Sequence, residues 1–101
     1  MIKSFRDRET KTIFEGEEAD AKEANRARKR LPTNLWKRAR AKLDQIDAAG
    51  RVTDLQTPSN HLEKLSGDRE GQHSIRINRQ YRICFRWSDA DAENVEIVDY
   101  H

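Results

Sequence analysis

The strongest constraint on the fold is a two-residue alternation of apolar and polar side chains in the last third of the chain. Residues 72–78, 81–87 and 94–100 all show it. Successive side chains of an extended strand point to opposite faces, so each segment predicts a β-strand with one apolar face. The connection Asn78–Gln80 is short enough for a hairpin, and residues 88–93 are predicted to form a polar loop.

The two faces of this predicted sheet differ in chemistry. The apolar face carries Ile75, Ile77, Ile83, Phe85, Trp87, Val95 and Ile97. The opposite face carries Arg76, Arg82, Arg86 and Tyr100. One face is therefore expected to pack on helices, while the other presents arginines to solvent.

Helices are predicted before the sheet. Residues 7–18 favour a short helix capped by Asp7 or Thr10, and residues 19–31 favour a helix or a helical linker that ends before Pro32. A longer helix is predicted from about Thr33 to Ala49. Thr33 or Asn34 is expected to cap its start, and Gly50 to end it in the left-handed conformation. Its apolar stripe comprises Leu35, Trp36, Ala39, Leu43 and Ile46.

The order of these elements predicts an α+β fold. Residues 1–6 alternate weakly and could form a short N-terminal strand, and residues 62–65 could form another. Two to three helices would pack on one face of a small, mainly antiparallel sheet. A chain of 101 residues with 35% hydrophobic content is expected to form one domain, residues 1–101, with a thin core.

Positive charge is concentrated between residues 22 and 42. This stretch contains nine Lys or Arg residues and the single acid Glu23, although the net charge of the whole chain is only +2. Such a stripe predicts a polyanionic or acidic partner, such as RNA or an acidic protein surface. The solvated face of a helix explains it equally well, and the sequence does not choose between these readings.

The cysteine count and the lengths of the apolar runs indicate which covalent links, metal sites and cellular locations to expect. Cys84 is the only cysteine, which excludes an intrachain disulfide and a cysteine-based metal framework. The three histidines, at positions 61, 73 and 101, do not have the spacing of metal ligands. No apolar run is long enough to span a membrane, and residues 1–6 lack a signal-peptide core. A cytoplasmic protein is expected.

Several side chains are suited to phosphate chemistry. The guanidinium groups of Arg76 and Arg82, on neighbouring strands, could bind a phosphate in a forked geometry, or could instead pair with acids such as Glu96. The chain ends with Asp99, Tyr100 and His101. An imidazole titrates near neutral pH and can act as a general acid or base, but a frayed polar terminus is the simpler interpretation of these three residues.

Four segments resemble one protein family closely. They are Leu62–Asp68 (LEKLSGD), Ser74–Asn78 (SIRIN), Tyr81–Trp87 (YRICFRW) and Val98–His101 (VDYH). Together they are similar to the HigB toxins, a branch of the RelE-like family of toxin–antitoxin systems, also called plasmid-maintenance killer proteins. The opening residues 1–5 match as well. The resemblance covers nearly the whole chain and is strongest over residues 62–101.

The resemblance implies a RelE-like fold and a metal-free, cofactor-free endoribonuclease that cuts mRNA in the ribosomal A site and arrests translation. It implies Arg82 at the scissile phosphate, and Asp99, Tyr100 and His101 in the roles of the family's terminal motif. Lys64, Arg76 and Arg86 are the expected RNA-binding residues. The implied partners are a HigA-like antitoxin with a helix-turn-helix domain, mRNA and the ribosome, with operator DNA reached only through the antitoxin.

One segment departs from the family pattern. Some members carry a His and a Lys just before the glycine turn, where this chain has Glu63 and Ser66. His61 and Lys64 are the two candidates to replace them.

Two other classes of function fit the same residues. The basic stretch and the arginine face would suffice for a non-catalytic RNA- or ribosome-binding module, with salt-dependent affinity. An interaction protein that acts mainly in a DNA-bound repressor complex with its antitoxin is the other alternative.

Overall fold

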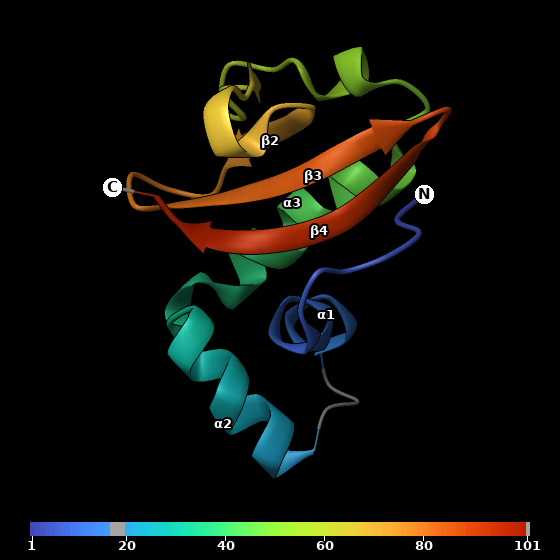
Figure 1. The fold of residues 1–101 in the computed structure, drawn as a ribbon. Coiled ribbons are helices and arrows are strands. Elements are labelled where there is room, and N and C mark those ends of the chain that lie inside the picture. Colours follow the sequence, from blue (N-terminus) through green and yellow to red (C-terminus); the bar gives the residue numbers. More distant parts are fainter. Residues whose placement is uncertain (17–19, 101) are drawn as a thin grey trace.

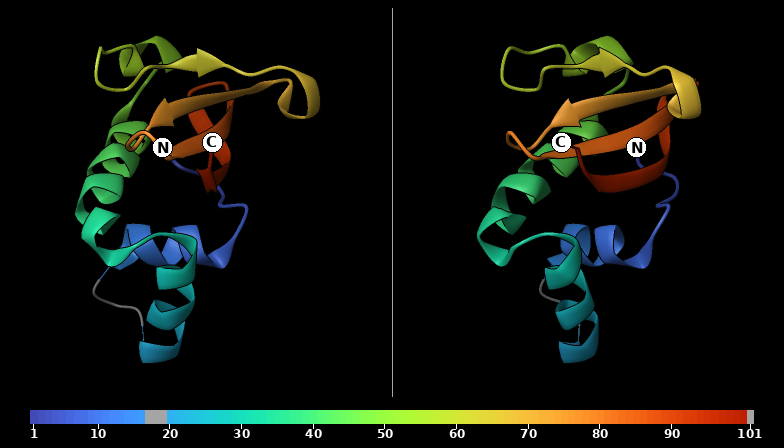
Figure 2. Two further views of the ribbon diagram at one scale, coloured as in Figure 1. Left: turned by 90° about the vertical axis from the view of Figure 1, so that its left-hand side faces the viewer. Right: turned by 60° about the vertical axis from the view of Figure 1, so that its left-hand side comes forward.

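The structure, a computed structural model, describes residues 1–16 and 20–100 (Figure 1). Its helices are α1 (Arg8–Glu15), α2 (Ala21–Arg30) and α3 (Trp36–Ala48), and its strands are β1 (Glu63–Lys64), β2 (Gln72–Arg76), β3 (Tyr81–Ser88) and β4 (Asp91–Asp99). Short 3-10 turns cover Thr33–Leu35, Val52–Leu55 and Gly67–Arg69. The predicted α+β architecture is confirmed. α3 lies against one face of the sheet, and α2 lies farther from the sheet than α3 (Figures 1 and 2).

The four strands pair in chain order, and every pair is antiparallel. The register aligns Ile75 with Ile83 and Ile97, and all three side chains are fully buried. It also aligns Arg76 with Arg82 and Val98 on the opposite face. Directly opposed residues share a face, so the predicted division between an apolar face and an arginine face is correct.

The predicted loop at residues 88–93 is wrong, because β4 begins at Asp91 and only Asp89 and Ala90 connect it to β3. The register shifts between Cys84 and Arg86, where Glu93 pairs with Arg86 and Glu96 with Cys84. Asn94, with a φ of 54°, lies within this irregularity. A bulge inserts one extra residue and interrupts the alternation of apolar and polar side chains. The alternation therefore predicted a strand only for the later part of β4.

The outer edge of β4 is covered by the N-terminal arm. Ile2 and Phe5 form isolated parallel bridges with Ala92 and Val95 rather than a full strand. Beyond them, the backbone N–H of Ile97 donates to Oγ1 of Thr10 at 3.0 Å. Arg30 in turn donates from Nη1 to the Ile97 carbonyl at 3.2 Å. Unpaired edge groups promote aggregation, so these contacts protect this edge.

Helix boundaries agree only partly with the predicted caps. Asp7 caps α1 as expected, since its Oδ1 accepts from the Thr10 backbone N–H at 2.6 Å. Neither Thr33 nor Asn34 caps α3, because a 3-10 turn without a side-chain cap precedes that helix. Ala49 in an extended conformation ends it, and Gly50 is not in the left-handed region.

The core lies between the apolar face of the sheet and the helices. Its fully buried members include Ile13 from α1 and Leu43 and Ile46 from α3, packed with Phe85 and Val95 of the sheet. Trp36 is partly buried against this cluster, and its Nε1 donates to the Leu31 carbonyl at 2.7 Å. Trp36 therefore packs on the core, as its place in the predicted apolar stripe indicates, and its N–H has a partner.

Candidate functional site

The side chain of Arg82 lies on the polar face of β3 and is only 9% exposed. Its Nε donates to Oγ of Ser74 at 2.8 Å, and its Nη2 donates to the backbone carbonyl of His61 at 2.6 Å. These bonds fix the plane of the guanidinium. Its Nη1 makes no hydrogen bond to any of the described residues and retains its donors for a ligand.

Tyr100 and Arg76 flank this guanidinium. The ring centroid of Tyr100 lies 6.0 Å from Cζ of Arg82, at the limit of a cation–π contact. The Tyr100 backbone N–H donates to the Gln80 carbonyl at 2.6 Å, which joins residue 100 to the β2–β3 hairpin. Arg76, directly opposite Arg82, has its Nη1 3.4 Å from Nε2 of His61. The structure thus brings Arg76, Arg82 and Tyr100 together and adds His61.

His61 occupies the left-handed region with a φ of 44°, which is uncommon for a residue other than glycine. The neighbouring residue holds the loop in this shape. Asn60 is fully buried, and its Oδ1 accepts from Nζ of Lys42 at 2.6 Å. Its Nδ2 donates to the Leu55 carbonyl and to Gln45 Oε1, and its own carbonyl accepts from the Arg76 N–H at 2.7 Å. His61 is therefore placed by a buried hydrogen-bond network on α3.

Asp99 lies on the other face of the sheet from Arg82. It pairs with Tyr81, whereas Arg82 pairs with Val98, so the alternation of β4 separates the two side chains. Oδ2 of Asp99 accepts from Nε2 of Gln80 at 3.1 Å. His101, the fourth predicted catalytic residue, lies outside the described residues.

Lys64 and Arg86, two of the predicted RNA-binding residues, lie away from Arg82. Lys64 pairs with His73 in the row that contains Phe85, on the face opposite to Arg82. Arg86 shares the face of Arg82 but lies four residues along β3, a distance of about 13 Å. Only Arg76 of the three predicted RNA-binding residues is close to Arg82.

A second polar cluster lies near Arg86. Glu96 is 8% exposed and sits between Arg69, at 3.2 Å, and Arg6, at 3.5 Å. The hydrogen bond from Arg69 to Glu96 raises the pKa of Arg69. Cys84 is fully buried nearby, and this burial raises the pKa of its thiol. The charges of this cluster are thus paired with one another within the protein.

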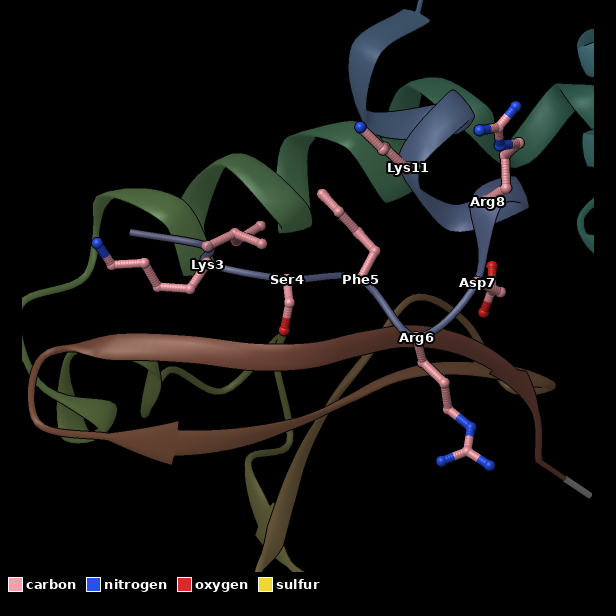
Figure 3. Close-up of a pocket in the computed structure, with 8 residues that line it drawn as sticks. Lys3, Ser4, Phe5, Arg6, Asp7, Arg8 and Lys11 are labelled. Carbon is pink, nitrogen blue, oxygen red and sulfur yellow. The ribbon is translucent and has the colours of Figure 1, made fainter.

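A cavity of about 460 Å³ lies between the N-terminal arm and the first turn of α1 (Figure 3). Lys3, Arg6, Arg8 and Lys11 give it a basic lining. Asp7, the one acid among the described residues that line it, caps α1 and lies 3.6 Å from Arg30. Of the residues predicted to be catalytic, the three that the structure describes, Arg82, Asp99 and Tyr100, do not line this cavity.

A further cavity, of about 310 Å³, lies beside Arg82. It is lined by Arg38, Ser59, His61, Arg76, Asn78 and Arg79. Arg38 belongs to the basic stretch of residues 22–42, for which a polyanionic partner was one of two predictions, whereas sequence reasoning did not assign a role to Ser59, Asn78 or Arg79. The supporting residues Ser74 and Asn60 were missed as well. The alternation of β2 places Ser74 on the face of Arg76 and could have identified it, whereas nothing local in the sequence indicates Asn60.

The part of the chain that the structure describes contains no helix long and apolar enough to cross a membrane. Within the same residues, no three His, Cys, Asp or Glu side chains are grouped in a way that could hold a metal ion.

Comparisons of sequence agree with the motifs found above. The family model described as "HigB-like toxin: RelE-like toxin of type II toxin-antitoxin system HigB" matches residues 3–101. The chain is 32% identical to Endoribonuclease HigB of Proteus vulgaris over 100% of both chains. It is 40% identical to Toxin HigB-1 of Vibrio cholerae over 63% of this chain and 68% of that protein. It is 37% identical to an uncharacterized protein of Haemophilus influenzae over 65% of this chain and 66% of that protein.

Comparison of structures supports the same fold. The YoeB–YefM complex from Staphylococcus aureus contains a chain that matches with a TM-score of 0.54 and 22% identity, covering 80% of this chain and 87% of that one. At this identity the match concerns the arrangement of the helices and strands.

Proposed function

Because the chain belongs to the HigB-like family of RelE-like toxins of type II toxin–antitoxin systems, we propose that it is an endoribonuclease that cleaves mRNA in the ribosomal A site and so arrests translation. The full-length match to Endoribonuclease HigB supports the activity. The observation that carries the proposal is the fixed Arg82 guanidinium, held by Ser74 and His61 with Nη1 still able to donate.

The proposed reaction needs no metal or cofactor, because the nucleophile is the 2′-hydroxyl of the substrate. That oxygen attacks the adjacent phosphorus, and the bond from phosphorus to the 5′-oxygen breaks. A base removes the 2′-hydroxyl proton, a cation stabilises the phosphorane, and an acid protonates the departing oxygen. One positioned acid or base contributes roughly 10²–10⁴ in rate. One oriented donor to the developing charge contributes about 10²–10³.

We assign the cation to Arg82, which would donate from Nη1 to a phosphate oxygen. Tyr100, 41% exposed beside it, would stack on a base or donate to the phosphate. His101 would exchange the protons. Asp99 would act on the arrangement of the chain end rather than on the phosphate, since its side chain is on the other face and binds Gln80.

Of the two candidates to replace the family's His and Lys, we propose His61. Its ring is beside Arg76 and its carbonyl binds Arg82. Lys64 would serve with Arg86 as a peripheral contact to RNA, since both lie away from Arg82 in the register of the sheet.

A small site with few catalytic groups would gain from a ribosome that holds the mRNA in line for attack, because positioning contributes several kcal/mol. We therefore propose that cleavage depends on the ribosome. We further propose a HigA-like antitoxin with a helix-turn-helix domain as partner, contact with operator DNA only through it, and a cytoplasmic location.

The test is a reconstituted translation reaction in which the 5′ ends of a defined mRNA are mapped with and without ribosomes. Wild type should cut the translated message and leave free mRNA intact. His101→Ala should lose cleavage, and Arg8→Gln should retain it, because Arg8 is an exposed arginine of α1 whose one ion pair with the described residues is to Glu23, at 3.6 Å. Rapid cleavage of free mRNA would refute ribosome dependence. Full arrest of translation by His101→Ala, with no cleavage by either protein, would favour a binding module.

A further inference from the structure

The cavity beside Arg82 is built from three separate segments. Arg38 comes from α3, Ser59 and His61 from the loop before β1, and Arg76, Asn78 and Arg79 from the β2–β3 hairpin region. Arg38 and Arg79 are exposed, and Arg76 is half-buried. Three arginines therefore line a space of about 310 Å³.

The charge of this cavity is not neutralised by the protein. Among residues 1–16 and 20–100, no carboxylate lines it, and none lies within ion-pair distance of Arg38, Arg76 or Arg79. Burial lowers the pKa of Lys42 behind Ser59, and the positive charge of Arg38 lowers it further. The positive charges of the three arginines in this cavity repel one another. An anionic ligand bound there would offset this repulsion.

The walls of the cavity are held in place before any ligand arrives. Nε of Arg76 donates to the Asn78 carbonyl at 3.1 Å, and Oδ1 of Asn78 accepts from the backbone N–H groups of Gln80 and Tyr81. On the other side, Lys42 donates to both Ser59 and Asn60. Ordering a site in advance reduces the entropy lost on binding.

The cavity adjoins the proposed reaction site. Arg76 and Arg82 are directly opposed on β2 and β3, so their Cα atoms are about 5 Å apart. His61 contributes to both places, because it lines the cavity and its backbone carbonyl accepts from Nη2 of Arg82. A strand of RNA with its scissile phosphate at Arg82 would therefore place a neighbouring phosphate at this cavity.

We propose that Arg38 and Arg79 bind a phosphodiester group of the cleaved RNA strand, next to the scissile phosphate. This inference rests on the proposed function. Arg76 would contact both phosphates, and Arg38 and Arg79 would close on the neighbouring one from opposite sides. The forked donors of arginine match the oxygens of a phosphate. The site reads the backbone of the RNA and not its bases, so it would hold the strand in register without selecting a sequence.

The test measures binding in the absence of cleavage and of ribosomes. The probe is a fluorescent single-stranded RNA of on the order of 8 nucleotides, the size of one small binding site, with 2′-O-methyl groups on every sugar so that it cannot be cut. Arg38→Gln/Arg79→Gln should weaken binding at low salt by at least about tenfold. It should also reduce the slope of log affinity against log salt by about 0.7, since the two arginines bind one phosphate and each neutralised phosphate of a single strand contributes about 0.7.

The matched control is Arg8→Gln/Lys11→Gln, which removes two exposed charges from α1. It should change the salt slope much less, and circular dichroism should show that both double variants are folded. An unchanged slope in the Arg38/Arg79 variant would overturn the proposal. So would a loss of binding to empty ribosomes or to poly-glutamate while affinity for the RNA probe is kept, because the surface would then serve ribosomal RNA or an acidic protein.

Failure of this proposal and failure of the proposed function are distinguishable. If the Arg38/Arg79 variant binds the probe as wild type does but mRNA is still cut during translation, only the phosphate site is wrong. If the probe binds as predicted but no message is cleaved, the phosphate site stands and the nuclease assignment fails.

Discussion

The backbone carbonyl of His61 accepts a 2.6 Å hydrogen bond from Nη2 of Arg82, and this bond joins a loop residue in the left-handed conformation to a buried arginine of the sheet. Ser74 completes the support at Nε of the same guanidinium. The position of Arg82 thus depends on the loop before β1 as well as on its own strand.

Arg82→Lys keeps the positive charge at this position but removes the planar guanidinium, so it tests which of the two cleavage requires. In Arg82→Lys, a single ammonium group cannot bind Ser74 and His61 and also present a planar donor pair to a phosphate. Cleavage in the translation reaction should fall by about 10²–10³. The free energy of unfolding should fall by about 1–3 kcal/mol, because buried acceptors lose their donor. Urea unfolding and mapped 5′ ends measure the two effects.

Ser74→Ala is the control for that prediction. It removes one acceptor but keeps the guanidinium and the bond to His61, so the loss of stability should be about 1 kcal/mol and the loss of cleavage smaller than in Arg82→Lys. An Arg82→Lys protein that cleaves at the wild-type rate would exclude Arg82 as the phosphate ligand.

Thr10→Val tests the protection of the β4 edge. Valine has nearly the shape of threonine, but it cannot accept the 3.0 Å hydrogen bond from the buried Ile97 N–H. An unsatisfied buried donor costs roughly 1–3 kcal/mol of stability. Chemical denaturation should show this loss, and hydrogen exchange of the Ile97 amide should accelerate. Thr12→Val, a nearby buried threonine of α1, serves as the comparison. Equal effects of the two substitutions would argue against a specific role for the Thr10 bond.

His73 should make the folded state sensitive to mild acid. Burial lowers the pKa of His73, and the charge of Lys64 lowers it further; its Nδ1 is buried without a hydrogen-bond partner among the described residues. The unfolded state therefore binds a proton more readily than the folded state. Stability is fully present above about pH 6.5, the ordinary value for histidine. It is lost as the pH falls from there through the lowered pKa of the folded state.

The measurement is the free energy of unfolding at pH 7.5 and pH 5.0 for wild type and His73→Phe, in which the ring can still pack near Phe85. The variant should lose less stability on acidification than wild type. Lys64→Gln should lie between them, because it removes the smaller cause of the shift. Identical pH dependence in all three proteins would show that His73 is not the responsible group.

Cys84 should react slowly with thiol reagents in the native protein. Its side chain is fully buried and burial raises its pKa, so both access and thiolate population are low at pH 8. Labelling with a chromogenic disulfide reagent should be much slower in buffer than in 6 M guanidinium, and Cys84→Ser should show no labelling. Immediate reaction of the native protein would mean that the polar face of the sheet opens around Cys84.

The polar face illustrates what could be predicted locally. The alternation of residues 72–78 and 81–87 predicted that Arg76 and Arg82 share a face, and the structure agrees. The same rule places Asp99 on the face away from Arg82. Val98 pairs with Arg82 and shares its face, so the next residue of the strand, Asp99, must point to the other face. The alternation thus separates Asp99 from Arg82, although the family resemblance implies a role for both at the catalytic site.

The bulge and the helix caps show the limits of local rules. Asn94 adds one residue to β4, and the periodicity that identifies a strand fails at that point. Gly50 was expected to end α3, but an extended Ala49 does so. Caps and bulges depend on how neighbouring elements meet, and their local signals are weak compared with those packing contacts.

The sequence by itself determined the α+β class, the apolar face of the sheet, the arginine face and the family, because these depend on residue types at short, regular spacings. Only the tertiary structure decided which basic side chains lie close together in space. Arg38, His61, Arg76 and Arg79 line one cavity although they come from a helix, a loop and a hairpin. The physical reason is that alternation specifies the face of each side chain, whereas long-range pairing, together with the buried network around Asn60, sets which segments adjoin.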